Sequence, residues 1–304
     1  MDWTTVATGL RFPEGPVPLD DGSVLVVEIE RGALSRCRTD GVVEVVADCG
    51  GGPNGAALGP DGWVWITNNG GCFEWIDLGD LLIPQPLSDD WTGGCIQRVE
   101  PASGTVETVY TQCDDRPLRA PNDLVFDGHG GFWFTDHGVR QERASDRTGV
   151  FYARADGSSI TEVLFPLDEP NGVGLSPGGD RLYVAETHAG RLWAWDVPEP
   201  GVAVGSGPLP PHGTLVVGLP GMQLFDSLAV DSAGNVCVGT LGNGGITVVS
   251  PDGRSVEHLP IDDPLVTNIA FGGPDRRTAY VTAAATGRLL AGEWPRPGLR
   301  LAHC

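Results

Sequence analysis

The chain has few basic residues and no long apolar run. Its 304 residues include 19 lysines and arginines against 40 aspartates and glutamates, so the net charge is −21. This excess of acid disfavours nucleic acid and anionic membranes as partners. No apolar run approaches the roughly 20 residues of a membrane-spanning helix, and the amino terminus, MDWTTVATG, lacks the basic and apolar regions of a signal peptide. We therefore expect a cytoplasmic protein that binds neither nucleic acid nor membrane.

Paired cysteines and helical patterns are scarce as well. The seven cysteines are an odd number and form no Cys-x-x-Cys motif, which predicts reduced thiols. Cys72 and Cys95 flank one long loop, so they are the candidate pair if a disulfide forms. Apolar residues almost never recur with helical spacing. The 45 glycines and 25 prolines fit a chain with many turns.

What the sequence does contain is one stretch repeated six times. Its clearest copy runs from Pro121 to Asp136: a polar residue, a short apolar strand, a glycine turn and a second apolar strand. We call the polar residues that begin the copies the six opening residues: Glu14, Asn54, Asn122, Asn171, Asp226 and Asn268. Eight positions further on, five copies have glycine and the sixth has arginine: Gly22, Gly62, Gly130, Gly179, Gly234 and Arg276. Glycine supplies the positive φ that a tight hairpin requires.

The spacing of the copies predicts the architecture. Successive opening residues are 40, 68, 49, 55 and 42 residues apart, and repeats of about 40–50 residues made of short strands are typical of propeller blades. We expect an all-β protein, a six-bladed β-propeller, with residues 1–304 as one domain. Residues 3–10 read as a strand that joins the last blade and closes the ring, which removes exposed sheet edges.

Strand direction places the candidate site. The first strand of each blade lines the central channel, so the six opening residues should crowd one mouth of it. Carboxylate and carboxamide oxygens converging on one axis are typical of a site for a hard cation. Since antiparallel second strands return to the same mouth, His137 and His188, which follow two of these strands, should lie there too. The insertion at about 69–94 starts from this mouth and reads as a lid that carries Trp75 and Trp91.

Five motifs in order resemble one known family. PEGP at 13–16, PND at 121–123, PNG at 170–172, FDS at 225–227 and TNIAFGGPD at 267–275 make the chain similar to the six-bladed propellers of the gluconolactonase, senescence-marker protein and luciferin-regenerating enzyme family. The resemblance covers Phe12 to about Leu301. It implies a metal-dependent hydrolase of lactones or related esters, with one divalent cation at the channel mouth. Calcium is the first choice, and zinc, manganese and magnesium are the alternatives, because an all-oxygen ligand set accepts several of these ions.

The resemblance also implies roles for individual residues. Glu14, Asn171 and Asp226 match the family's metal ligands, and Asn122 matches a residue that binds the metal or the substrate. Asp226 is also the candidate general base, with His137 as the alternative. Asn54, like Asn268, either faces the site or caps a turn through its own backbone.

Two departures from the family bear on the substrate. Sugar-lactone members often have an arginine two residues before the blade-three asparagine; here that position is Ala120, and Arg119 lies one further back. The usual Thr-Asp-Pro of blade three is Thr135-Asp136-His137. Arg119, Trp75 and Trp91 are the candidate substrate contacts beside Asn122 and Asn54. We therefore expect a small-molecule lactone or ester with an apolar or aromatic portion.

Two other functions remain open from the sequence alone. One is a non-catalytic binding propeller stabilised by a cation, because propellers host many functions. The other is hydrolysis of organophosphorus esters at the same site. The physiological substrate, the native metal and the oligomeric state are not determined by these motifs.

Overall fold

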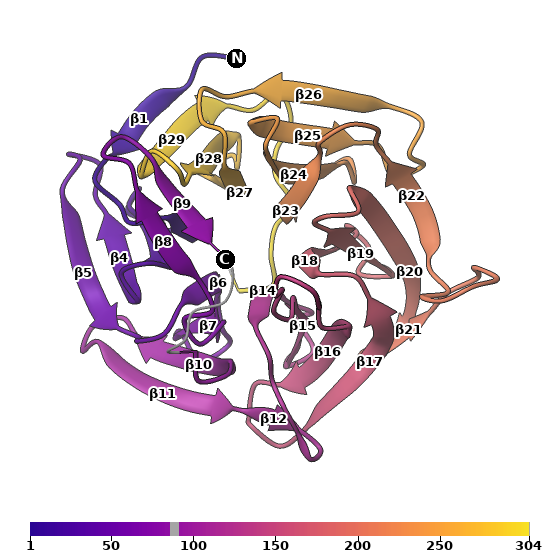
Figure 1. The fold of residues 1–304 in the computed structure, drawn as a ribbon. Coiled ribbons are helices and arrows are strands. Elements are labelled where there is room, and N and C mark those ends of the chain that lie inside the picture. Colours follow the sequence, from indigo (N-terminus) through magenta and orange to yellow (C-terminus); the bar gives the residue numbers. More distant parts are fainter. Residues whose placement is uncertain (86–90, 304) are drawn as a thin grey trace.

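The computed structural model describes residues 1–85 and 91–303. Within them it contains strands and no helix, so no helix there is long and apolar enough to cross a membrane. Six antiparallel sheets are arranged around a central axis (Figure 1). The predicted all-β six-bladed propeller is confirmed.

Blades 1 to 3 follow the predicted repeats, with the first strand innermost. Blade 1 is formed by β2 (Pro13–Pro18), β3 (Val24–Glu28), β4 (Ala33–Cys37) and β5 (Val43–Asp48). Blade 2 is formed by β6 (Pro53–Leu58), β7 (Val64–Asn68), β10 (Cys95–Glu100) and β11 (Thr105–Tyr110). Blade 3 is formed by β14 (Pro121–Phe126), β15 (Gly131–Asp136), β16 (Thr148–Arg154) and β17 (Ile160–Leu167).

Blades 4 to 6 complete the ring. Blade 4 is formed by β18 (Pro170–Leu175), β19 (Arg181–Glu186) and β20 (Arg191–Glu199), with β21 (Val202–Val204) and β22 (Thr214–Gly218) both paired to β20. Blade 5 is formed by β23 (Leu224–Val230), β24 (Val236–Leu241), β25 (Gly245–Val249) and β26 (Val256–Pro260). Blade 6 is formed by β27 (Val266–Gly272), β28 (Thr278–Ala283) and β29 (Arg288–Glu293).

The N-terminal strand closes the ring as predicted. β1 (Thr4–Ala7) pairs with β29 antiparallel, so the outermost strand of blade 6 comes from the start of the chain. Two short hairpins lie outside the blades: β8 (Glu74–Asp77) with β9 (Leu82–Gln85), and β12 (Gln112–Cys113) with β13 (Arg116–Pro117).

The turns between first and second strands have the backbone that the glycine pattern predicts. The five glycines all have positive φ, from 70° at Gly179 to 84° at Gly22. Arg276, in the copy without glycine, also has a positive φ of 55°. The sixth turn therefore keeps the same conformation with a residue that rarely adopts it.

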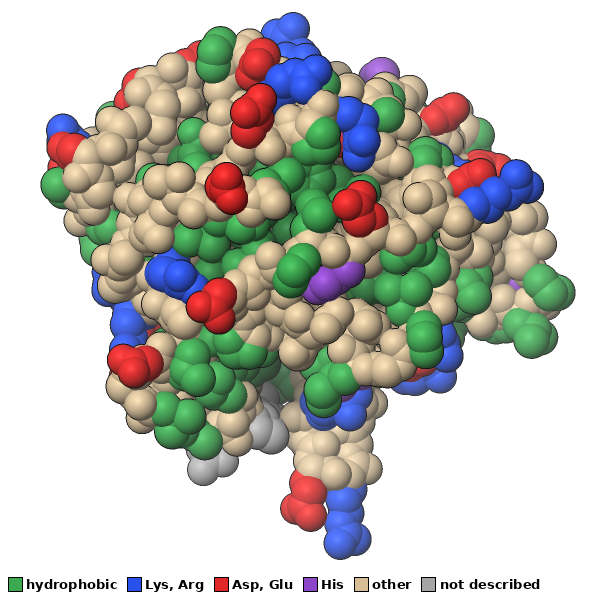
Figure 2. All heavy atoms as spheres, turned by 90° about the horizontal axis from the view of Figure 1, so that it is seen from above, with side chains coloured by type: hydrophobic (Ala, Val, Ile, Leu, Met, Phe, Trp, Pro, Cys, Tyr) green, Lys and Arg blue, Asp and Glu red, His purple; other side chains and the backbone are tan. Residues whose placement is uncertain are grey.

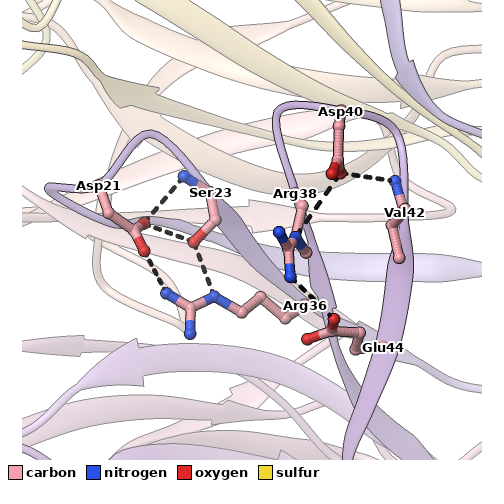
Figure 3. Close-up of polar contacts among 7 residues, drawn as sticks. All are labelled: Asp21, Ser23, Arg36, Arg38, Asp40, Val42 and Glu44. Atoms are coloured by element: carbon pink, nitrogen blue, oxygen red, sulfur yellow. Dashed lines mark hydrogen bonds and ion pairs between the residues drawn. The ribbon is translucent and has the colours of Figure 1, made fainter.

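Blade 1 shows how exposed turns are held (Figure 3). Asp21 accepts hydrogen bonds from the backbone N–H and the hydroxyl of Ser23, at 3.0 and 2.6 Å. Arg36 of β4 donates to the same hydroxyl at 2.9 Å. In the next turn, Asp40 accepts from the backbone N–H of Val42 at 3.2 Å. These side-chain caps on the backbone fix the turns, whereas the exposed ion pairs beside them contribute little to stability.

Apolar side chains fill the space between neighbouring blades. Trp65 of blade 2 is fully buried against Phe126 and Phe132 of blade 3, and Trp133 is fully buried in the cluster between blades 3 and 4. On the side of the molecule seen in Figure 2, acidic and basic side chains lie among apolar ones, and several of them touch a side chain of opposite charge. The six cysteines in the described residues, Cys72 and Cys95 included, are free thiols.

Candidate functional site

The six opening residues come together at one end of the channel. Each lies at or near the start of an innermost strand, and none exposes more than 7 % of its surface. Asn268 donates from Nδ2 to Oε2 of Glu14 at 2.9 Å, which joins blade 6 to blade 1. Ser227, next to Asp226, donates its hydroxyl to Oδ1 of Asn171 at 3.4 Å. These bonds join neighbouring blades, and the charge of Asp226 in blade 5 acts on Glu14 in blade 1, so buried oxygens from several blades lie near one another.

Some of these buried oxygens lack a partner. Within the described residues, Oε1 of Glu14 and Oδ1 of Asn122 accept no hydrogen bond. Glu14 and Asp226 also form no ion pair with any described arginine or histidine. An unpaired buried carboxylate or carbonyl is costly. These oxygens thus fit the role of cation ligands.

Burial changes the acidity of the carboxyl groups. It raises the pKa of Glu14 well above its ordinary value, and the charges of Asp226 and Asp123 raise it further. Burial also raises the pKa of Asp226 to about 7, although hydrogen bonds from Asn171 and the Ser227 amide lower it in part. A cation beside such groups restores their charged form, because an opposite charge lowers a carboxyl pKa.

Amide oxygens are needed to complete a metal site here. Among residues 1–85 and 91–303, no three histidine, cysteine, aspartate or glutamate side chains lie close enough to hold a metal ion alone. Glu14 and Asp226 would therefore act with the asparagines Asn171 and Asn122. Hard cations such as calcium take mixed sets of carboxylate and carbonyl oxygens.

Asp123 is a buried carboxylate that the sequence analysis did not single out. Its Oδ2 accepts a hydrogen bond from the backbone of Val173 in blade 4 at 3.0 Å, and burial raises its pKa to about 7. The repeats contain a signal that singles out Asp123. The residue after the opening position is glycine in three copies, and only in blade 3 is it a carboxylate.

Threonines hold the backbone of three blades at this mouth. Thr67 donates to the carbonyl of Asn122 at 2.5 Å, and Thr135 donates to the carbonyl of Asn171 at 2.5 Å. Thr267 donates to the carbonyl of Pro13, next to Glu14, at 3.0 Å. In each pair the hydroxyl belongs to one blade and the carbonyl to the next, so these bonds fix the spacing of the predicted ligands.

The polar residues that end the second strands hold the neighbouring backbone. Asp136 accepts from the amides of Arg119 and Ala120 at 2.7 and 2.8 Å. Glu28 and Glu186 accept from the amides of Arg11 and Asp168, at 2.6 and 2.9 Å. These side chains fix the segments that lead into the first strands, just before the opening residues.

The two histidines lie together near this mouth. His137 is partly buried, and burial lowers its pKa; Glu169 opposes that shift, and His188 and Arg140 add to it. Nδ1 of His137 lies 3.2 Å from the carbonyl oxygen of Gly138. His188 is more exposed and contacts the carboxylate of Glu169.

The predicted lid contains the β8–β9 hairpin, which reaches over the start of blade 1 (Figure 1). Leu82 donates its amide to Ala285 of blade 6 at 2.8 Å, and Asp77 pairs with Arg11 at 2.9 Å. Trp75 packs between Phe12 and Phe73, with ring centroids 5.0 and 6.0 Å apart.

The second lid tryptophan is on the blade 3 side. Trp91 donates from Nε1 to the carbonyl of Asn69 at 3.0 Å. The guanidinium of Arg119 stacks over it at 4.3 Å and pairs with Asp146 at 2.8 Å. The structure thus brings Trp91 and Arg119 together, while Trp75 belongs to a separate apolar cluster. Part of the predicted lid, residues 86–90, lies outside the described residues.

The channel beyond the opening residues is mostly apolar. A cavity of about 630 Å³ is lined by inner strands, among them Val17, Val125 and Ile269. Residues 299–303 line its far end. Arg296 anchors this C-terminal segment through an ion pair with the buried Asp231 at 2.6 Å. The polar mouth and the C-terminal segment therefore lie at opposite ends of the channel.

Comparison with known proteins gives consistent matches. The family model described as the SMP-30/Gluconolactonase/LRE-like region matches residues 12–285. A gluconolactonase of Zymomonas mobilis is 25 % identical over 92 % of this chain and 78 % of its own length. A lactonase drp35 of Staphylococcus saprophyticus is 36 % identical over 45 % of this chain and 41 % of its own length.

Solved structures share the fold. A gluconolactonase of Xanthomonas campestris superposes with a TM-score of 0.75 at 20 % identity, over 96 % of this chain and 89 % of that one. A calcium-binding protein, regucalcin, of Agrobacterium tumefaciens superposes with a TM-score of 0.71 at 16 % identity, over 98 % of this chain and 99 % of that one.

Proposed function

Because the chain belongs to the SMP-30/gluconolactonase/LRE-like family, we propose that it is a hydrolase that opens lactones with the help of one divalent cation. The observation that carries the proposal is the buried cluster at the channel mouth. Its carboxylates have raised pKa values and no cationic partner among the described residues, and two of its oxygens accept no hydrogen bond there. A divalent cation satisfies all of these groups at once.

Glu14, Asn171 and Asp226 would hold the cation, with Asn122 as a further ligand or a substrate contact. When bound, the cation polarises the lactone carbonyl and acidifies a water molecule. Asn171 and Asn122 are neutral, so they provide oxygens without cancelling the positive charge that the carbonyl oxygen needs. Calcium is our first choice for an all-oxygen set of this kind.

Asp226 is the proposed general base. It lies in the cluster, and one of its oxygens already accepts the amide of Ser227 at 3.1 Å, which fixes the carboxylate. The proton of the attacking water passes to Asp226 as the carbon–oxygen bond forms. His137 is the alternative base, because burial lowers its pKa and so favours a neutral ring.

We propose a lactone with an apolar or aromatic portion as the substrate. The position where sugar-lactone members often have arginine is Ala120, buried beside Trp91 and Phe73. Arg119 is already engaged by Asp146 and by the face of Trp91. A sugar lactone would find few free polar side chains here, whereas aromatic surface is available.

The test is a lactone panel assayed with and without chelator. We expect hydrolysis of alkyl and aryl lactones, loss of activity after chelation, and recovery on addition of calcium. A protein that binds the cation but hydrolyses no lactone would be a binding propeller. Hydrolysis of phosphoric triesters in preference to every lactone would assign the site to organophosphorus esters.

A further inference from the structure

A second cluster of ionisable side chains lies between blades 3 and 4, beside the predicted metal ligands. Its centre is Glu169, whose side chain is 3 % exposed. Arg140 binds the Glu169 carboxylate through two nitrogens, at 2.6 and 2.9 Å. Ser145 donates its hydroxyl to the same carboxylate at 3.4 Å. A charged carboxylate is thus held firmly in a buried position.

His188 is the third residue that contacts this carboxylate. Its Nδ1 contacts Oε2 of Glu169, while 44 % of the His188 side chain remains exposed. A carboxylate on Nδ1 orients an imidazole and leaves Nε2 as the free nitrogen.

The Glu169–His188 pair is linked to the predicted ligand Asn171 from both sides. Thr187, next to His188, accepts a hydrogen bond from Nδ2 of Asn171 at 3.1 Å. Glu169 lies two residues before Asn171, and its carbonyl accepts the amide of Thr187 at 3.2 Å. Glu169 has a φ of 52°, a strained value for a residue other than glycine, and such strain concentrates at functional sites.

We propose that His188, oriented by Glu169, is the general acid that protonates the leaving oxygen when the lactone ring opens. This role rests on the proposed lactonase function and divides the proton transfers between two groups. Asp226 takes a proton from water as the new carbon–oxygen bond forms. The ring carbon–oxygen bond then breaks, and Nε2 of His188 gives its proton to the departing alkoxide. His188 recovers a proton as Asp226 releases one, so the cycle balances.

The other charged and titratable groups that face His188 support this assignment. Arg140 comes from the loop after β15 and, together with Ser145, occupies the other positions on the Glu169 carboxylate. His137 has its own Nδ1 near the carbonyl of Gly138 and no carboxylate partner among the described residues. Of the two histidines near the mouth, only His188 therefore has its ring held by a carboxylate.

The test uses leaving groups of different basicity. An alkoxide must be protonated as it departs, whereas a phenoxide is stable enough to leave alone. We expect His188→Gln to lower kcat about 10²–10⁴-fold on δ-nonalactone, the range for a lost general acid. On dihydrocoumarin, which releases a phenoxide, the loss should stay below about tenfold, because departure needs little acid assistance. Glu169→Gln should show the same contrast with smaller losses.

Matched controls separate this role from a structural one. His129 is exposed at the β14–β15 turn, away from the polar mouth, so His129→Gln should keep wild-type kcat on both substrates. Calcium content and the thermal midpoint are measured for every variant. Equal losses of His188→Gln on both lactones, or no loss, would overturn the acid role while leaving the lactonase function intact.

The wild-type protein provides a second measurement that needs no folded variant. Its kcat across lactones of increasing leaving-group basicity should fall only shallowly, because His188 supplies the proton. A steep fall overturns the acid role. A wild-type protein that hydrolyses none of these lactones overturns the proposed function and the acid role together, so the two failures are distinguishable.

Discussion

Asp226 is the residue whose substitution best separates metal binding from proton transfer. Asp226→Asn keeps an oxygen ligand and removes the proposed base and one charge. We expect kcat to fall about 10²–10⁴-fold, as for other lost general bases, while the propeller stays folded. Steady-state kinetics at saturating calcium measure the effect. Near-normal turnover with the cation bound would exclude Asp226 as the base and favour His137.

Thr135 tests the bonds between blades at the site. Its hydroxyl donates to the carbonyl of Asn171 and accepts the amide of Asp123, both buried. Thr135→Val leaves these groups unpaired, which should cost about 1–3 kcal/mol of unfolding free energy. Thr135→Ser keeps the hydroxyl and serves as the matched control. Urea unfolding measures both variants. Equal stability of the Val variant and the wild type would contradict the account.

At the scale of single residues, some parts of the site could be predicted from the sequence and others could not. The opening residues share a repeated position, so their convergence follows from strand direction. The environment of Asp123 depends on the Val173 amide of the neighbouring blade, which no local pattern reveals. Likewise, the contact of Arg140 with Glu169 depends on where the loop after β15 folds. The sequence therefore placed His188 at the mouth but gave it no role.

At the scale of elements, the lid determines the expected substrate preference. Burying one large aromatic contact contributes about 1.5–3 kcal/mol, or about ten- to hundredfold in binding. Trp91→Ala, and to a similar extent Trp75→Ala, should raise KM for an alkyl or aryl lactone without changing calcium content. Comparison with gluconolactone measures the specificity. Faster turnover of gluconolactone, or wild-type behaviour of both variants, would show that the lid only packs on the rim.

The elements themselves could be predicted well because the repeat contains its own turns. Glycine at the fixed position has positive φ in five blades, and Arg276 adopts the same conformation in the sixth. The pairing of β1 with β29 also followed, since the last blade lacked an outer strand. The course of the lid over blade 1 could not be predicted from the repeats, because it depends on single contacts such as that of Leu82 with Ala285.

For the whole molecule, the metal-free fold should lose stability as the pH rises. The pKa of Asp123 and that of Asp226 are raised to about 7, and that of Glu14 is also raised. In the unfolded chain such groups titrate near pH 4. Between about pH 4 and pH 7 the folded state therefore binds more protons than the unfolded state, so stability falls with rising pH.

Calorimetry of the chelated protein checks this linkage. We expect a lower thermal midpoint at pH 8 than at pH 5.5, and a larger gain from calcium at pH 8. A Glu14→Gln/Asp226→Asn variant controls for the repulsion of the many surface carboxylates. The thermal midpoint of this variant should depend less on pH than that of the wild type. A calcium effect of the same size at both pH values would contradict the raised pKa values.

The most direct test of the central claim is a calcium titration of lactone hydrolysis. The protein is stripped with chelator, its residual metal is measured by elemental analysis, and δ-nonalactone turnover is followed as calcium is added at protein concentrations well above Kd. The account predicts negligible activity at the start and a linear rise that ends at one cation per chain. Full lactonase activity in protein without divalent metal, or no activity at any calcium concentration, would contradict it.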